Sequence, residues 1–371
     1  MSKRILITGG AGFIGSHLAD ALLRRGYRVR AFDSLIPQVH GDGGRRPHYL
    51  TREAELVEGD VRDPLRVRSA LLGVDAVFHF AAMVGVGQSM YEVCRYTAVN
   101  NLGTAVLLEA LIERPVERLV VASSMSVYGE GLYRSNSGRL VSGLERGIEQ
   151  LKRGEWELRD DSGLLGPVPT PESKTPSLAS VYALSKYDQE RMCLLIGAAY
   201  GIATVALRFF NVYGPRQALS NPYTGVLAIF ASRLLNGQRP LVFEDGNQRR
   251  DFVSVYDVAE ACCLALERPS VTGGVFNVGS GRDISVIDLA HCLAKELGKP
   301  WLEPEIAGKY RVGDIRHCFA DVTHARERLG YAPKLSLAEG IADLAGWLEG
   351  QIAVDRVEEA RAALEKRGLT V

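Results

Sequence analysis

Residues 4–18 read RILITGGAGFIGSHL, and this stretch decides the fold. The apolar run at 4–8 predicts a buried strand, and SHLADALLRRG (16–26) predicts an amphipathic helix. Between them, Gly9, Gly12 and Gly15 are spaced as G-x-x-G-x-x-G. Glycines in such a turn let the backbone approach a pyrophosphate, while the N–H groups of the following helix face the anion. We therefore expect a dinucleotide site here, with a plain tight turn as the alternative.

Strand-like and helix-like segments continue to alternate after this turn. VRAFD (29–33), AVFHFAA (76–82) and RLVVASS (118–124) predict strands, and a helical pattern lies near 101–113. This alternation favours an α/β fold with a doubly wound parallel sheet and helices on both faces. His79 is expected to be a buried strand residue rather than an acid or base.

Two carboxylates follow predicted strands. Asp33 ends the second strand, 18 residues after Gly15. A carboxylate there can accept hydrogen bonds from the adenosine ribose and would repel a 2′-phosphate, so NAD is favoured over NADP. Capping of a following helix is the alternative. Asp60, in VEGDVRD, could contact the adenine amino group, and a turn-forming role explains it almost as well.

The bulk composition excludes several classes of protein. The chain has 371 residues, enough for two structural regions. Lys+Arg and Asp+Glu both total 44, so no global basic field points to nucleic acid. No apolar run approaches the ~20 residues of a membrane span, and the first ten residues leave no room for a signal peptide. Six cysteines without a CxxC pair suggest neither a metal site nor a disulfide framework. We expect a cytoplasmic protein without a metal.

A tyrosine and a lysine share one helix face in YALSK (182–186). Tyr182 and Lys186 are four residues apart, so their side chains are neighbours. An adjacent ammonium favours the ionised form of a phenol, which would make Tyr182 a general base. An ordinary half-exposed helix face is the alternative from these five residues alone.

The ordered motifs resemble the extended short-chain dehydrogenase/reductase family, and in particular its nucleotide-sugar epimerase branch. The matching pieces span residues 4 to 345 and are TGGAGFIGSHL, FHFAA, VNNLGT, ASSMSVYG, YALSK, LRFFNVYGP, RRDFVSVYDVA and FNVGSG. The resemblance implies an NAD-binding Rossmann-type domain over residues 1–207. It also implies a smaller, discontinuous α/β substrate-binding domain, mainly 208–345, followed by a helical tail at 346–371.

The resemblance also implies the catalytic roles. Tyr182 would take a proton from a sugar hydroxyl, Ser124 would hydrogen-bond the same oxygen, and Lys186 would hold the nicotinamide ribose and lower the tyrosine pKa. Lowering that pKa from ~10 to ~7 requires about 4 kcal/mol. The implied cofactor contacts are Gly9, Gly12, Phe13, Ile14, Gly15, Asp33, Asp60, Val61, Phe80, Ala81, Ala82, Asn100, Tyr182 and Lys186. Relatives usually dimerise through the helix near 101–113 and the YALSK helix, which implies a homodimer.

The residues after Ser124 narrow the reaction. Family members that remove water across C5 and C6 carry an Asp-Glu pair at the positions of Met125 and Ser126, and 3,5-epimerases carry a cysteine where Ser126 stands. Neither Met nor Ser is a competent acid or base near neutral pH. The remaining chemistry is 4-epimerisation through a 4-keto sugar. A 4-ketoreductase and a uronic-acid decarboxylase are the enzymatic alternatives, and a nucleotide-sensing regulator is the non-enzymatic one.

Four residues match family positions that contact the substrate. Asn211 matches a position near the diphosphate, and Arg250 and Arg311 match two arginines that grip it in a planar fork. Cys318 falls at the back of the sugar pocket, with a packed core thiol as the alternative. The stretch NPYTGVLAIFASRLLNGQRPLVFEDG resembles the branch that acts on dTDP-L-rhamnose at C4, although composition and spacing do not identify the sugar.

Two segments depart from the family pattern. Residues 131–168 are inserted between the motifs that hold Ser124 and Tyr182, and SGLERGIEQLKRG within them predicts a short amphipathic helix. We expect this insertion near the active-site mouth, either as a lid or specificity loop or as an inert surface decoration. The tail, VDRVEEARAALEKRGL (354–369), predicts a charged helix that packs on the second domain or on a partner subunit.

Overall fold

A parallel sheet of seven strands forms the centre of the computed structural model, which describes residues 2–41 and 44–370. The strand order is β15-β11-β5-β4-β1-β2-β3, and all six pairings are parallel. The prediction of a Rossmann-type doubly wound parallel sheet is therefore confirmed. The strands are β1 (Arg4–Thr8), β2 (Arg28–Asp33), β3 (Glu55–Glu58), β4 (Ala76–His79), β5 (Arg118–Ser124), β11 (Ala203–Phe209) and β15 (Val275–Val278).

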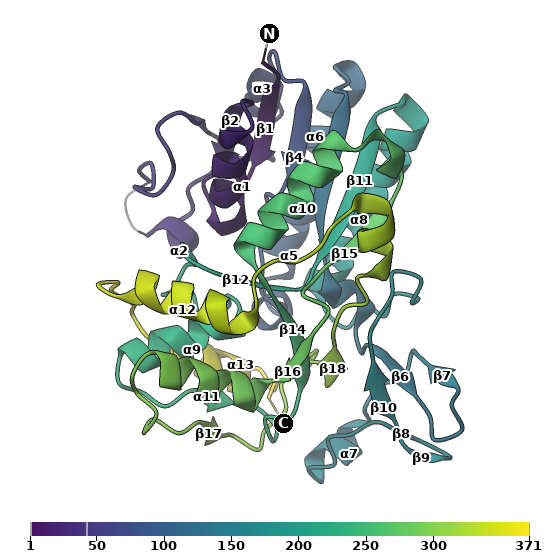
Figure 1. Cartoon of the computed structure of the whole chain (residues 1–371), viewed down its shortest axis with the longest axis vertical. Coiled ribbons are helices and arrows are strands. Elements are labelled where there is room, and N and C mark those ends of the chain that lie inside the picture. Colours follow the sequence, from purple (N-terminus) through teal and green to yellow (C-terminus); the bar gives the residue numbers. More distant parts are fainter. Residues whose placement is uncertain (1, 42–43, 371) are drawn as a thin grey trace.

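Helices cover both faces of this sheet because its strands are apolar on both sides. Ile5 and Ile7 of β1 belong to one hydrophobic core, while Leu6 between them belongs to the other. The first core lies beneath α1 (Phe13–Arg24) and α10 (Val255–Glu267), which pack together. The second lies beneath three helices on the opposite face, α3 (Pro64–Ala70), α6 (Gly103–Glu113) and α8 (Val181–Tyr200). Figure 1 shows this layered arrangement in the upper half of the molecule.

The observed β4 ends three residues earlier than the predicted strand. The Phe80 N–H still donates to the Thr8 carbonyl oxygen of β1 at 3.1 Å and lies 3.2 Å from the Thr8 hydroxyl. The next N–H group, that of Ala81, donates to this hydroxyl at 3.2 Å, and the strand pairing ends here. Short helices follow, α4 (Val86–Ser89) and α5 (Val93–Tyr96), and a π-helical turn (Thr97–Leu102) leads into α6; α2 (Pro37–His40) lies after β2.

A second region with its own hydrophobic core lies below the carboxyl ends of the sheet strands (Figure 1). Its sheet contains β12 (Asn211–Tyr213), β14 (Arg249–Ser254), β16 (Asp283–Ser285) and β18 (His317–Cys318), and β13 (Leu241–Val242) pairs with β17 (Glu305–Ile306). Its helices are α9 (Val226–Leu235), α11 (Val286–Glu296), α12 (Leu337–Leu348) and α13 (Val357–Glu365). The chain leaves this region to supply α10 and β15 to the first sheet, and it leaves again over Ala325–Leu329, which packs against β15 in the first core.

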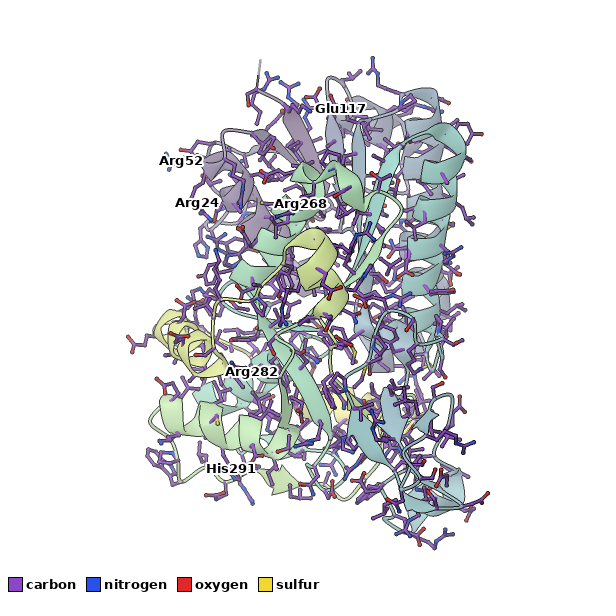
Figure 2. The ribbon with its side chains drawn as sticks, turned by 45° about the vertical axis from the view of Figure 1, so that its right-hand side comes forward. Arg24, Arg52, Glu117, Arg268, Arg282 and His291 are labelled. Atoms are coloured by element: carbon purple, nitrogen blue, oxygen red, sulfur yellow. The ribbon has the colours of Figure 1, made fainter. Side chains whose placement is uncertain are left out.

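The orientation of the strands can be followed from two labelled side chains. Figure 2 shows Glu117, which precedes the first residue of β5, at one end of the molecule and His291 of α11 at the other. The carboxyl ends of the strands therefore face the second region. In an open α/β sheet, that edge is where ligands bind. Within residues 2–41 and 44–370, no helix is both long and apolar enough to cross a bilayer.

The insertion forms a small lobe of its own, at the lower right of Figure 1. It contains β6 (Leu132–Arg134), β7 (Leu140–Val141), α7 (Ile148–Lys152), β8 (Arg159–Asp160), β9 (Gly163–Leu164) and β10 (Gly166–Val168). The predicted short helix is present as α7. The three-stranded sheet β10-β6-β7 was not expected from the sequence.

Candidate active site

The turn from β1 to α1 has the geometry of a phosphate cradle. Gly9 has a φ of 71° and lies against Phe80 and Ala81, and a Cβ on Gly15 would stand 2.3 Å from the Gly9 carbonyl oxygen. Only glycine fits at both positions. Gly12, the N-cap of α1, supplies no side-chain cap to the N–H groups of the first turn, which starts with Phe13 and Ile14. Uncapped N–H groups at a helix N-terminus suit an anion.

Asp33 lies directly beside this turn at the end of β2. Its carboxylate accepts hydrogen bonds from the backbone N–H groups of Ala11 and Leu35, each at 3.0 Å. These bonds fix the carboxylate next to the glycine loop, where a dinucleotide ribose would lie. Asp60 is instead paired with Arg62 at 2.6 Å and accepts its N–H, which matches the turn-forming alternative.

The remaining residues expected at the cofactor lie around β4. Ala82 directly precedes Met83, which Asn100 holds in place. The fully buried Asn100 side chain accepts a hydrogen bond from the Met83 N–H and donates to the Met83 carbonyl oxygen and to the Ser185 hydroxyl. Val61 is buried in the core against Gly103. Asn100 and Val61 thus support the site from behind, whereas Phe80 and Ala81 lie against the glycine loop.

Tyr182 lies in the first turn of α8, which begins where the Ser180 hydroxyl caps the Ala183 N–H at 3.1 Å. Its side chain and that of Ser124, at the end of β5, line the same cavity. Burial raises the pKa of the Tyr182 phenol, and the neighbouring Ser124 hydroxyl acts in the opposite direction. The structure therefore brings together two members of the expected triad.

The third member, Lys186, is buried on α8, four residues after Tyr182. Its ammonium donates to Gln189 at 2.6 Å, and burial lowers its pKa to about 8. Burial sets the direction of the Tyr182 pKa here, and the expected action of Lys186 together with the nicotinamide ring on that pKa stays a prediction.

Gln189 connects Lys186 to a buried polar network that sequence reasoning missed. Gln189 donates to Thr104 at 2.8 Å and lies 3.2 Å from His79 Nε2. The two His79 ring nitrogens also lie 2.8 Å from the hydroxyls of Thr104 and Thr8. The expected buried, hydrogen-bonded His79 is confirmed. The network links the lysine to Thr8, which caps the loop after β4.

A buried ion pair fixes α8 to the sheet one turn beyond Lys186. Arg208 of β11 donates to both carboxylate oxygens of Glu190, at 2.9 and 2.7 Å, and Ser123 donates to the same carboxylate at 2.6 Å. Ser123 precedes Ser124 on β5. The pair therefore fixes the helix that carries Tyr182 relative to the strand that carries Ser124.

A cavity of about 390 Å³ extends from Tyr182 into the second region. Three of the four expected substrate residues line it: Asn211, Arg250 and Arg311. Arg250 donates to the carbonyl oxygens of Ile315 and Arg316, and Arg311 pairs with Asp314 at 2.8 Å. Within the described part of the chain, no cluster of three or more His, Cys, Asp or Glu could hold a metal.

Cys318, the fourth expected substrate residue, does not line this cavity. It is 1% exposed on β18, with its thiol 3.9 Å from the Thr170 hydroxyl. Cys318 is the β18 residue that pairs with Arg250 of β14, and its side chain packs in the first hydrophobic core. The packed core thiol, which the sequence left open, is what the structure shows.

The insertion also stays outside the described cavity lining. Its Glu157 and Arg146 instead join a buried charge network: Arg316 bonds Glu157 at 2.9 Å and Glu244 at 2.8 Å, and Arg146 bonds Glu244 at 2.8 Å. The insertion is thus docked on the second region by charged side chains.

Comparisons with known proteins agree with this geometry. Residues 5–140 and 162–279 match the model of the NAD dependent epimerase/dehydratase family, and the gap between the two stretches falls inside the insertion. The dTDP-L-rhamnose 4-epimerase of Burkholderia thailandensis is 38% identical over 94% of this chain and 96% of its own length.

Two crystal structures show the same fold. UDP-glucose 4-epimerase from Thermotoga maritima, solved with UDP-glucose, has a TM-score of 0.77 at 33% identity and covers 94% of this chain and 99% of its own. UDP-glucose 4-epimerase from Thermus thermophilus, in complex with NAD, has a TM-score of 0.74 at 32% identity, covering 94% of this chain and 100% of its own. The glycine loop, the YALSK helix and the cavity agree with these similarities. The chain therefore belongs to the NAD dependent epimerase/dehydratase family.

Proposed function

We propose that the chain is an NAD-dependent nucleoside-diphosphate-sugar 4-epimerase. The observation that carries this proposal is the meeting of Ser124 and Tyr182 in one wall of the cavity, with Lys186 behind them. The glycine loop and Asp33 fit a dinucleotide, as argued above. The Burkholderia relative makes dTDP-L-rhamnose the first candidate substrate, and UDP-glucose is the second.

The cavity supports one proton transfer and offers no second acid–base pair. Met125 and Ser126 line it beside Ser124, as the sequence predicted, and neither can exchange a proton near neutral pH. The one carboxylate among the described lining residues, Asp314, is paired with Arg311 and Arg250. A dehydratase or 3,5-epimerase needs further proton-transfer groups at this place, whereas a 4-epimerase does not.

Each residue of the triad then has a distinct task. When bound, NAD supplies the hydride acceptor and a positive charge beside the phenol. Tyr182 takes the proton of the sugar 4-hydroxyl and later returns it, and the helix dipole at its position in α8 favours the phenolate. Ser124 orients the same hydroxyl. Lys186, held by Gln189, supports the ribose from below.

The test uses purified protein, dTDP-L-rhamnose and UDP-glucose in turn, and no added cofactor. Proton NMR would detect a C4 epimer if NAD is bound and regenerated in place. Turnover that requires added NADPH would instead indicate a ketoreductase, and loss of a carboxyl group from a uronic-acid substrate would indicate a decarboxylase. If neither sugar reacts even with NAD supplied, the proposal fails for both.

We also propose a cytoplasmic homodimer. All six cysteines are free thiols, which suits a reducing compartment. Leu184 and Leu195 of α8 and Leu102, just before α6, are 46%, 58% and 53% exposed, and they lie on the two helices through which relatives usually dimerise. Light scattering would show a monomer for Leu184→Glu/Leu195→Glu and a dimer for the control Leu65→Glu on α3. A monomeric wild-type protein would contradict the proposal.

A further inference from the structure

The tail helix α13 forms part of the substrate cavity. Val357, Ala360, Arg361 and Leu364 line it, and their spacing places them on one face of the helix. Residues 84–87, which lead into α4, line the same cavity, and Leu364 approaches Gly87 there. Residues 346–371 lie outside the stretches that match the family model. The tail nevertheless contributes a wall to the site of the proposed function.

The tail segment is attached on both sides of the cavity. In the second region, Arg233 bonds Glu358 at 3.2 Å, and the Val312 N–H donates to the Leu369 carbonyl at 2.9 Å. Towards the first region, the Arg367 guanidinium lies over the Tyr91 ring at 4.2 Å. These contacts come from both regions and hold α13 in a defined position over the cavity.

Without the tail, the expected diphosphate-binding residues, Arg250 and Arg311, carry less net positive charge than the two phosphates carry negative charge. Arg250 and Arg311 share one counter-ion, Asp314, at 3.5 and 2.8 Å. Burial works to raise the pKa of Asp314, but the charges of Arg311 and Arg250 outweigh it and hold that pKa below its ordinary value. The carboxylate therefore stays ionised, and the three side chains together carry one net positive charge. A sugar nucleotide carries a negative charge on each of its two phosphates.

Arg361 can supply the missing charge. Its Nε donates to Glu365 at 3.1 Å, and Glu365 is shared with Lys309 at 2.8 Å. Among the described residues, its terminal nitrogens approach only Glu358, at 3.9 Å, which is too far for a hydrogen bond. The planar fork is therefore available to a phosphate in the cavity.

We infer that Arg361 binds the diphosphate of the substrate and that α13 is the wall that presents it. This inference rests on the proposed function and adds a residue that the motifs do not contain. The ligand class is a nucleoside diphosphate, free or joined to a sugar.

The experiment compares Arg361→Gln with Arg356→Gln in the full-length protein. Arg356 is an exposed arginine at the N-cap of the same helix and does not line the cavity, so both variants lose one positive charge from one element. Calorimetry would measure the binding of dTDP and UDP. We expect Arg361→Gln to weaken binding about 10- to 100-fold, as for the loss of charge-assisted hydrogen bonds. Arg356→Gln should bind like the wild type.

Steady-state kinetics with the sugar that reacts would give a second readout. KM should rise in Arg361→Gln with little change in kcat, and Arg361→Lys should recover part of the loss because it keeps the charge without the fork. If Arg361→Gln binds dTDP and UDP as the wild type does, the inference is overturned and the proposed function stands. If the wild type binds neither nucleotide and epimerises neither sugar, both fall.

Discussion

Glu190 should be essential for holding the catalytic helix in place. Its carboxylate, 1% exposed, pairs with both arms of Arg208, which is 5% exposed. Glu190→Gln keeps the shape of the side chain but leaves the Arg208 charge without an ionic partner. Breaking a buried pair on one side costs about 3–5 kcal/mol.

The size of the effect follows from the chain length. With an unfolding entropy of roughly 2.1 cal/mol/K per residue, 371 residues give about 0.8 kcal/mol/K. A loss of about 3–5 kcal/mol therefore lowers Tm by about 4–6 °C. Well below Tm, kcat should also fall by about 10-fold or more, because Ser123 loses its ionic acceptor and the alignment of Ser124 with Tyr182 loosens.

Differential scanning calorimetry and NMR turnover would measure the two effects. The matched control is Glu113→Gln, which breaks a solvent-exposed pair with Arg68 (2.7 Å) on the same face of the sheet. Exposed pairs contribute little, so this variant should keep the wild-type Tm. Replacing both buried partners with apolar residues, Glu190→Leu with Arg208→Met, should recover part of the lost stability. If Glu190→Gln melts and turns over like Glu113→Gln, the pair does not position α8 and the reasoning is refuted.

Three further outcomes are expected. Tyr182→Phe should lower turnover by about 10²–10⁴-fold without changing Tm. The control Tyr200→Phe, at the exposed end of α8, should keep wild-type turnover, and wild-type turnover in Tyr182→Phe would remove Tyr182 from the mechanism. Burial holds the pKa of His79 at about 3, so below pH 6.5 the unfolded chain binds a proton that the native chain does not, and wild-type stability falls as the pH drops from 6.5 towards 3. His79→Gln should be less stable in urea at pH 7.5, with a difference from the wild type that shrinks below pH 6.5; a constant difference down to pH 5 would contradict this. Deleting residues 133–165 removes Arg146 and Glu157 from the network around the buried Arg316, so Tm should fall further than in Glu190→Gln while sugar preference is kept; a changed preference would support the lid hypothesis.

Short-range patterns were sufficient to predict the frame of the protein. β1 and β5 have the predicted bounds, 4–8 and 118–124, because apolar runs flanked by turn residues define strands locally. The glycine spacing required a tight turn, and Gly9 does adopt a positive φ. Tyr182 and Lys186 share a helix face because four residues make about one turn. Each of these features depends on neighbours within one element.

The tertiary structure decided which distant residues complete the site. Lys186 reaches His79, 107 positions earlier, only through Gln189, and no local pattern marks that glutamine. The tail was expected as a charged helix that packs on the second domain or on a partner subunit, and no pattern in it predicted that Arg361 lines the cavity. Conversely, Cys318 does not line the cavity, although its motif position suggested the back of the sugar pocket. The physical reason is that burial and charge compensation depend on all the elements packed around a side chain, and that packing is fixed only when the two regions and the tail come together.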